Sequence, residues 1–166
     1  MELKQITSWE DFDSVEDLLR NDEKSWLLES GPITRRIKNI GNFYLELIND
    51  SVMNVNKEDA DFINSSKKDI RVREVILYCD KHPLVYAKSL LPVETINKGF
   101  KPLGSLGKKP LGDILFDKSI FRRDTKVYSA FQGPHSKNYW GRKVKYFANG
   151  YPFSVMEIFL IENNNA

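Results

Sequence analysis

The chain has 166 residues, of which 41% are hydrophobic and 29% are charged, and its formal net charge is +2. This length and composition predict one globular domain, residues 1–166, that can bury a sizeable core. The small net charge gives no reason to expect a nucleic-acid partner, and no apolar run approaches the ~20 residues of a membrane span. Because the N-terminus also lacks a signal-peptide core, we expect a cytoplasmic protein that has no membrane partner.

The first third of the chain predicts short helices. Ser8 followed three residues later by Asp11 is typical of a helix N-terminus. The amphipathic segment 23–29 predicts a second helix, and the segment 33–37 predicts the start of a third. Gly31-Pro32 separates these two helices, and such a joint can act either as a turn or as a hinge.

Strand signals begin after these helices. The apolar run 43–48 predicts a strand, and the polar residues 49–51 predict a turn after which the run 52–55 pairs back. The following segment, 56–68, is polar and predicts a loop or a short helix.

Two longer runs in the middle of the chain predict a β-hairpin. The runs 70–79 and 83–92 are rich in β-branched, aromatic and aliphatic residues, and they flank a polar turn at 80–82. Strand side chains alternate between faces, and both faces of the run 70–79 are largely apolar. We therefore expect this strand to be central and covered on each side.

The segment 103–112 contains three glycines and resembles a phosphate-binding loop only superficially. It lacks the Walker spacing, and no Ser or Thr follows its Gly-Lys pair. We interpret this segment as a lid or tight connection that lies over another part of the protein.

The C-terminal part of the chain predicts three strands. The run 119–130 has strand character, and the runs 139–148 and 151–160 flank Asn149-Gly150, which is the strongest short-range hairpin signal. We expect the polar tail 162–166 to fray.

Periodicity selects two unusual charges. Arg73 shares a strand face with Val75 and Leu77, and Glu157 shares one with Val155 and Phe159. Burying a charge is costly unless it meets a partner. The two residues could form a salt bridge with each other or have partners elsewhere. Alternatively, they line a closed apolar pocket that binds a small aromatic or cyclic acid, with Arg73 holding its carboxylate and Glu157 facing a hydroxyl or a transferable proton.

The sequence offers no signal for a metal site or a catalytic thiol. His82 and His135 fall in predicted loops and are not spaced as metal ligands. Cys79 is the one cysteine, so no intramolecular disulfide can form, and a cysteine in a buried strand is usually inert. We therefore expect no metal.

Several short motifs, in order along most of the chain, resemble the chorismate lyase family. These motifs are Trp26-Leu27-Leu28-Glu29 with Thr34-Arg35-Arg36, the run from Arg73 to Cys79, the run from Leu106 to Phe116, Trp140-Gly141-Arg142, and Glu157-Ile158-Phe159-Leu160. The segment Leu-Gly-Lys-x-Pro-Leu-Gly, which begins at Leu106, is the most distinctive of them.

The resemblance implies a fold and an activity. The fold class would be α+β, a single antiparallel β-sheet with helices packed on it and an internal ligand pocket covered by helical flaps. The activity would be cofactor-independent conversion of chorismate to 4-hydroxybenzoate and pyruvate, the first committed step toward ubiquinone in many bacteria. We expect a monomer.

The resemblance also implies roles for particular residues. Arg73 and Glu157 match the residues that meet the product's carboxylate and hydroxyl, so they are the catalytic candidates. Ile33 and Leu111 match flap positions that contact the ligand. Lys88 stands where some members carry Arg, so it is a candidate for contact with a second carboxylate.

Two alternatives remain open. The UTRA effector-binding domain of some bacterial transcription regulators resembles chorismate lyase in fold, so the chain could sense an aromatic or cyclic acid without catalysis. A lyase that makes a related product, such as 3-hydroxybenzoate, is the second alternative.

Overall fold

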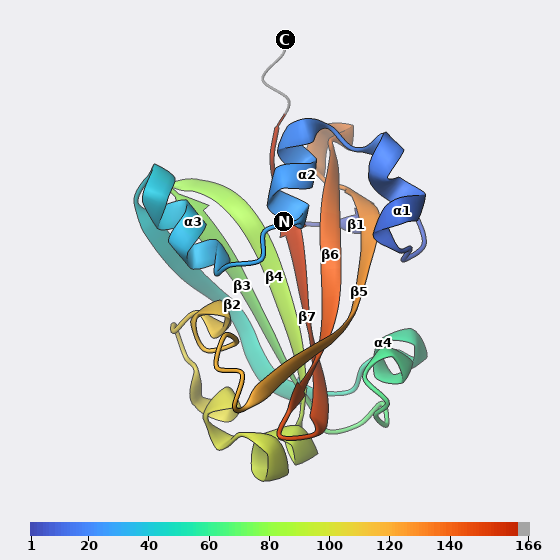
Figure 1. Cartoon of the computed structure of the whole chain (residues 1–166), viewed down its shortest axis with the longest axis vertical. Helices are drawn as coiled ribbons and strands as arrows, with labels where there is room; N and C mark the ends of the chain where they lie inside the picture. The colour runs from blue at the N-terminus through green and yellow to red at the C-terminus, as the bar shows by residue number, and fades with distance from the viewer. Residues whose placement is uncertain (163–166) are drawn as a thin grey trace.

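The computed structural model describes residues 1–162, and the tail 163–166 lies outside the described residues. Figure 1 shows one antiparallel sheet that curls along its width, with the strand order β1-β5-β6-β7-β4-β3-β2. The strands are β1 (Lys4–Gln5), β2 (Phe43–Met53), β3 (Ile70–Cys79), β4 (His82–Pro92), β5 (Phe121–Gln132), β6 (Asn138–Ala148) and β7 (Tyr151–Phe159). The predicted single sheet is therefore confirmed.

Both predicted hairpins are present. Strands β3 and β4 are joined by Asp80 and Lys81, whose φ angles are 48° and 70°, and β6 and β7 are joined by Asn149 and Gly150, at 47° and 90°. Positive φ at both central residues matches the right-handed twist of the paired strands. Strand β3 lies inside the sheet, as its two apolar faces predict, and β4 and β7 lie inside it too.

The predicted turn at 49–51 is wrong. Residues 43–53 form the single strand β2, which pairs with β3 along its whole length and has a bulge between Leu47 and Asn49. Asp50 accepts hydrogen bonds of 2.6 and 3.0 Å from Nε and Nη2 of Arg71 on β3. The partner of Asp50 is a charge on the adjacent strand, and local propensity does not reveal a partner of this kind.

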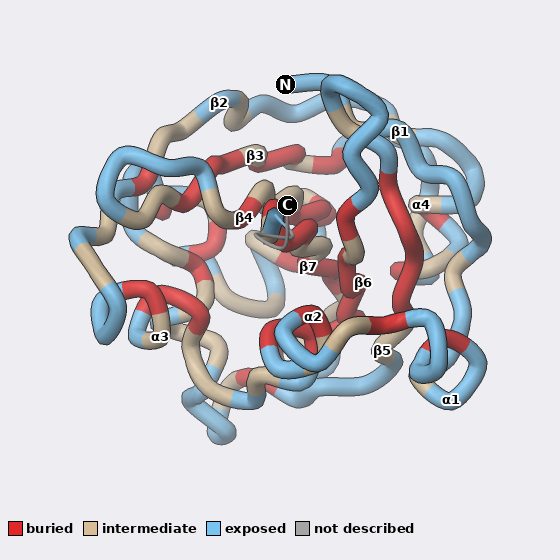
Figure 2. Tube along the Cα trace, turned by 90° about the horizontal axis from the view of Figure 1, so that it is seen from above, coloured by how far each residue is buried: buried red, intermediate tan, exposed pale blue. Residues whose placement is uncertain are grey.

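The helices cover both faces of the sheet. They are α1 (Phe12–Val15), α2 (Asn21–Leu27), α3 (Ile33–Ile40) and α4 (Lys57–Phe62), with short helical turns at Glu16–Leu18, Thr95–Gly99, Lys101–Ser105, Leu111–Asp113 and Pro134–Ser136. Figure 2 shows α1, α2 and α3 along one side of the sheet. Helix α4 contributes Phe62 to a cluster with Val72 and Leu90, whose side chains point to the opposite face. No helix within 1–162 is long and apolar enough to cross a membrane.

The first helix begins later than its sequence signal predicts. Asp11 caps α1 by accepting a hydrogen bond of 3.0 Å from the backbone N–H of Ser14. Ser8 instead donates to Glu10 Oε1 at 2.7 Å. An Asp is as good an N-cap as a Ser, so the sequence alone does not select between them.

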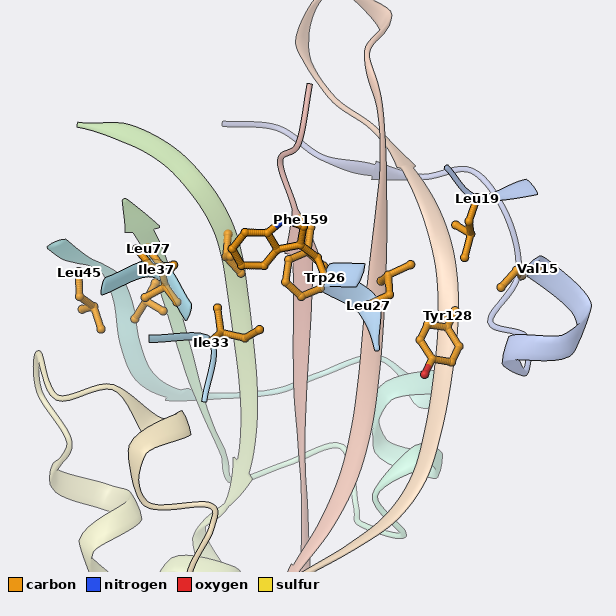
Figure 3. Close-up of a cluster of buried hydrophobic side chains, with 12 residues drawn as sticks. Val15, Leu19, Trp26, Leu27, Ile33, Ile37, Leu45, Leu77, Tyr128 and Phe159 are labelled. Atoms are coloured by element: carbon orange, nitrogen blue, oxygen red, sulfur yellow. The ribbon is translucent and has the colours of Figure 1, made fainter. Parts of the chain in front are cut away.

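The main core lies between the sheet and α1–α3. Figure 3 shows Trp26 of α2 beside Phe159 of β7 and Ile37 of α3 beside Leu77 of β3, with Leu27 of α2 in the same cluster. Leu27 and Ile37 are fully buried, and each such side chain stabilises the fold by about 1.5–3 kcal/mol. The two helices are therefore held on the sheet on both sides of the Gly31-Pro32 joint.

Candidate active site

A partly enclosed cavity lies on the same face of the sheet as α2 and α3. Its volume is about 60 Å³, several times the ~10–15 Å³ that one water needs. Side chains of β3, β4, β6 and β7 form its floor. Residues 31–34 and five residues between 110 and 116 also line it. We name the segments that carry them the first flap, 27–34, and the second flap, 107–116.

Arg73 stands at the second-flap end of the cavity. Its side chain follows the odd-numbered face of β3 and is only 3% exposed. Nη2 donates to the carbonyl oxygens of Gly107 and Lys109 in the second flap, at 3.0 and 2.8 Å. Nε is buried and has no hydrogen-bond partner within 1–162. Arg73 lines the cavity, and an unpaired guanidinium N–H is a ready donor for an anion.

Burial lowers the pKa of Arg73, the negative charge of Asp50 opposes this effect, and the positive charge of Arg71 adds to it. Asp50 hydrogen-bonds Arg71 rather than Arg73. Arg73 therefore enters the cavity as a cation that backbone carbonyls hold in place but no carboxylate neutralises by direct contact in the described chain. A ligand carboxylate would supply that missing charge.

Glu157 stands on β7 in the floor of the same cavity. It does not pair with Arg73. Its partner is Arg142 on β6, whose Nε donates to Glu157 Oε1 at 2.9 Å. Glu157 Oε2 makes no hydrogen bond within residues 1–162, so one carboxylate oxygen is left for a ligand hydroxyl.

The structure brings together four of the five residues that the sequence selects. Arg73, Glu157, Ile33 and Leu111 all line the cavity, Ile33 from the first flap and Leu111 from the second. Lys88 does not line it. Its neighbours on β4, Ala87 and Ser89, do, so alternation places Lys88 on the opposite face of the sheet.

Comparison with known proteins identifies the group to which the chain is related. The family model described as chorismate lyase matches residues 3–164. The chain belongs to the chorismate lyase family. It is 28% identical over 156 residues to a probable chorismate pyruvate-lyase of Pseudoalteromonas translucida, with 86% of each chain covered. It is 31% identical over 142 residues to one of Photobacterium profundum, covering 82% of this chain and 77% of the relative.

Solved structures show which fold this chorismate lyase family member shares. The ligand-binding domain of a putative GntR-family regulator from Bordetella bronchiseptica has a TM-score of 0.55 at 14% identity, covering 74% of this chain and 87% of that one. A GntR-family regulator from Enterococcus faecalis has a TM-score of 0.53 at 12% identity, covering 74% and 93%. These likenesses concern the fold alone, and they confirm the predicted chorismate lyase/UTRA-like sheet.

Sequence reasoning missed two cations in the cavity of this family member, Arg142 and Arg123. A signal for Arg142 was present. The two-residue turn at 149–150 makes Ala148 the partner of Tyr151. Six residues further from the turn along each strand, Arg142 is paired with Glu157. No comparable signal existed for Arg123, because it lies next to a register shift in the β5–β6 pairing.

Tyr146 of β6 also lines the cavity and stacks on Phe153, with ring centroids 5.3 Å apart. Burial raises the pKa of Tyr146, and the negative charge of Glu157 adds to this. The phenol is therefore neutral, and it extends the apolar wall beside the carboxylate. The arrangement as a whole can bind a small cyclic molecule with an acid group at one end and a hydroxyl at the other.

Proposed function

We propose that this protein converts chorismate to 4-hydroxybenzoate and pyruvate. The observation that carries the proposal is the cavity with Arg73 at one end and Glu157 at the other, each with an atom that has no partner inside the described chain. Membership of the chorismate lyase family supports it. The product would feed ubiquinone biosynthesis.

The chemistry asks little of the protein beyond binding and exclusion of water. Cleavage of the bond between the ring and the ether oxygen releases the enolate of pyruvate, and the ring carbon that bears the hydroxyl gives up a proton. Uptake of one proton then converts the enolate to pyruvate. The ring becomes aromatic, so the step is strongly downhill. The protein need only hold the reactive conformer, keep water away and guide one proton.

In this proposal Arg73 anchors the ring carboxylate. Its Nε donates to the anion, and the two carbonyls of the second flap keep the guanidinium plane in place. Glu157 Oε2 accepts a hydrogen bond from the ring hydroxyl, next to the carbon that loses its proton. The apolar side chains Val75, Leu77 and Val155 line the floor between them.

Both flaps take part in binding. Ile33 covers the ring from the first flap and Leu111 covers it from the second. The cavity volume of about 60 Å³ is small for a substrate with two carboxylates, so the flaps move to admit it. Flap opening then limits product release.

The test is a direct assay of the purified protein. We expect 4-hydroxybenzoate, identified by chromatography, and an equal amount of pyruvate from chorismate in the presence of a chelator and without added cofactor. Chorismate incubated without protein is the control for spontaneous decomposition. Formation of 3-hydroxybenzoate would correct the product, and a folded protein that yields neither acid would refute a lyase.

The likeness in fold to GntR-family ligand-binding domains favours a second candidate, a sensor that binds such an acid without changing it. A sensor would bind 4-hydroxybenzoate in a titration and leave chorismate intact. The same purified sample therefore separates the two functions.

A further inference from the structure

Arg142 joins two parts of the candidate site that are far apart in the sequence. Nε donates to Glu157 Oε1 at 2.9 Å, and Nη1 donates to the carbonyl oxygens of Leu27 and Glu29 at 3.0 and 2.8 Å. Its side chain is 8% exposed and that of Glu157 is 16% exposed. One buried guanidinium therefore holds both the carboxylate in the cavity floor and the beginning of the first flap.

The flap contacts answer a specific need of the backbone. Leu27 is the last residue of α2, and the last carbonyls of a helix have no partner within it. Arg142 donates hydrogen bonds to the carbonyl oxygens of Leu27 and Glu29. The residues that follow, from Gly31 to Ile33, line the cavity. The position of the first flap therefore depends on a side chain of the sheet.

The contact with Glu157 fixes the rotamer of that carboxylate. Arg142 and Glu157 face each other across the β6–β7 pairing, so the backbone places them opposite each other before the side chains meet. Burial tends to lower the pKa of Arg142, but the charge of Glu157 and the hydrogen bond to it more than offset burial and raise this pKa. Arg142 is therefore a permanent cation, and with Oε1 held by it, Oε2 is the oxygen left to act on a ligand.

We infer that Arg142 is a positioning residue of the proposed reaction, which orients Glu157 toward the ring hydroxyl and ties closure of the first flap to that carboxylate. This inference rests on the proposed function. Arg142 affects the reaction by orienting Glu157. It does not bind the substrate carboxylate, which Arg73 holds in the proposed function. Loss of the three hydrogen bonds that Arg142 donates should then lower kcat more than it weakens binding of the product.

The test is a double-mutant cycle in kcat. In the protein that keeps Glu157, we expect Arg142→Lys to lower kcat about tenfold or more. A Lys cannot make all three hydrogen bonds that the Arg142 guanidinium donates. In a Glu157→Gln background the same change should cost less than about threefold, because the group that Arg142 positions is already disabled. Equal losses in the two backgrounds would overturn the inference.

Arg36 offers a matched control. It also donates to a carbonyl of α2, that of Ser25, at 2.6 Å, but it is only half-buried and does not contact Glu157. Arg36→Lys should therefore change kcat by the same factor with Glu157 and with Gln at that position. If Arg142 had a purely structural role, Arg142→Lys would likewise change kcat by the same factor with Glu157 and with Gln at that position.

Two further measurements keep the outcome decisive. Hydrogen exchange of the amides in the first flap needs no chorismate, and Arg142→Lys should accelerate it by about tenfold while leaving exchange in α4 unchanged. If the natural protein makes no product, the proposed function fails while exchange still tests the tie to the flap. Arg142→Gln is the second variant, and if neither variant folds, Arg142 serves stability and the inference is wrong.

Discussion

Replacing Arg73 by Ala tests the anion-binding end of the cavity most directly. The substitution removes the buried Nε that has no partner in 1–162, and it also removes the two donor contacts to the second flap. Both losses weaken ligand binding, so a single affinity measurement would not separate them. A pair of ligands does: 4-hydroxybenzoate carries the carboxylate, and 4-hydroxybenzamide is a neutral molecule of nearly the same shape.

The size of the effect follows from burial. Arg73 is 3% exposed, so its contact with a carboxylate is almost fully withdrawn from water. Losing one partner of such a charge pair costs about 2–5 kcal/mol, or roughly 30- to 4,000-fold in the dissociation constant. Loss of the flap contacts affects both ligands, because both occupy the cavity beneath the same flap.

Titration calorimetry with both ligands is the assay. In the natural protein we expect the benzoate to bind at least about 30-fold more tightly than the benzamide. In Arg73→Ala this preference should fall to within about threefold, while the affinity for both ligands decreases.

Arg71 provides the matched control for this experiment. It precedes Arg73 on the same face of β3, is bound to Asp50 and does not line the cavity. Arg71→Ala should leave the preference for the benzoate within about threefold of its natural value. A preference that survives in Arg73→Ala would refute the assignment of the ligand carboxylate to Arg73.

The remaining predictions concern the substrate's second charge and the response to pH. Arg123 lines the cavity and is exposed, so it can meet the second carboxylate, which chorismate has and 4-hydroxybenzoate lacks. Arg123→Ala should therefore raise KM for chorismate about five- to tenfold and change the affinity for 4-hydroxybenzoate less than about twofold. Arg122→Ala, next to it and outside the cavity lining, should change neither quantity. Burial, and then the hydrogen bond and charge of Glu74, raise the pKa of Tyr86 above its reference value of 10.0. The stability that Tyr86 contributes is therefore fully present below pH 10.0 and is lost as pH rises toward its folded pKa. Urea midpoints should show the advantage of the natural protein over Tyr86→Phe shrinking above that pH, and a constant difference would contradict this.

Local signals in the sequence determined much of the fold. Asn149-Gly150 predicted the last hairpin because the turn needs positive φ at both positions, and these residues tolerate it. Alternation along two strands singled out Arg73 and Glu157 as charges among apolar neighbours, and both line one cavity. Both features depend only on residues that are close to one another in the sequence.

The face on which Lys88 lies was beyond the sequence. Strand β4 pairs with β3 through a register shift between Leu77 and Tyr78, and a shift of one residue exchanges the two faces of a strand. The observed register sets Lys88 opposite Glu74, away from the cavity, and leaves Ser89 opposite Arg73. The family resemblance supplied a position, and only the pairing decided where its side chain went.

The sequence by itself determined which charges would be out of place in an apolar strand, because alternation is a property of a few neighbouring residues. The tertiary structure decided what those charges do. Carbonyls of the second flap hold Arg73, and Arg142 holds Glu157 together with the first flap. Most of these partners are distant along the chain, and hydrogen bonds of this kind exist only once packing has brought the backbone of each flap over the sheet.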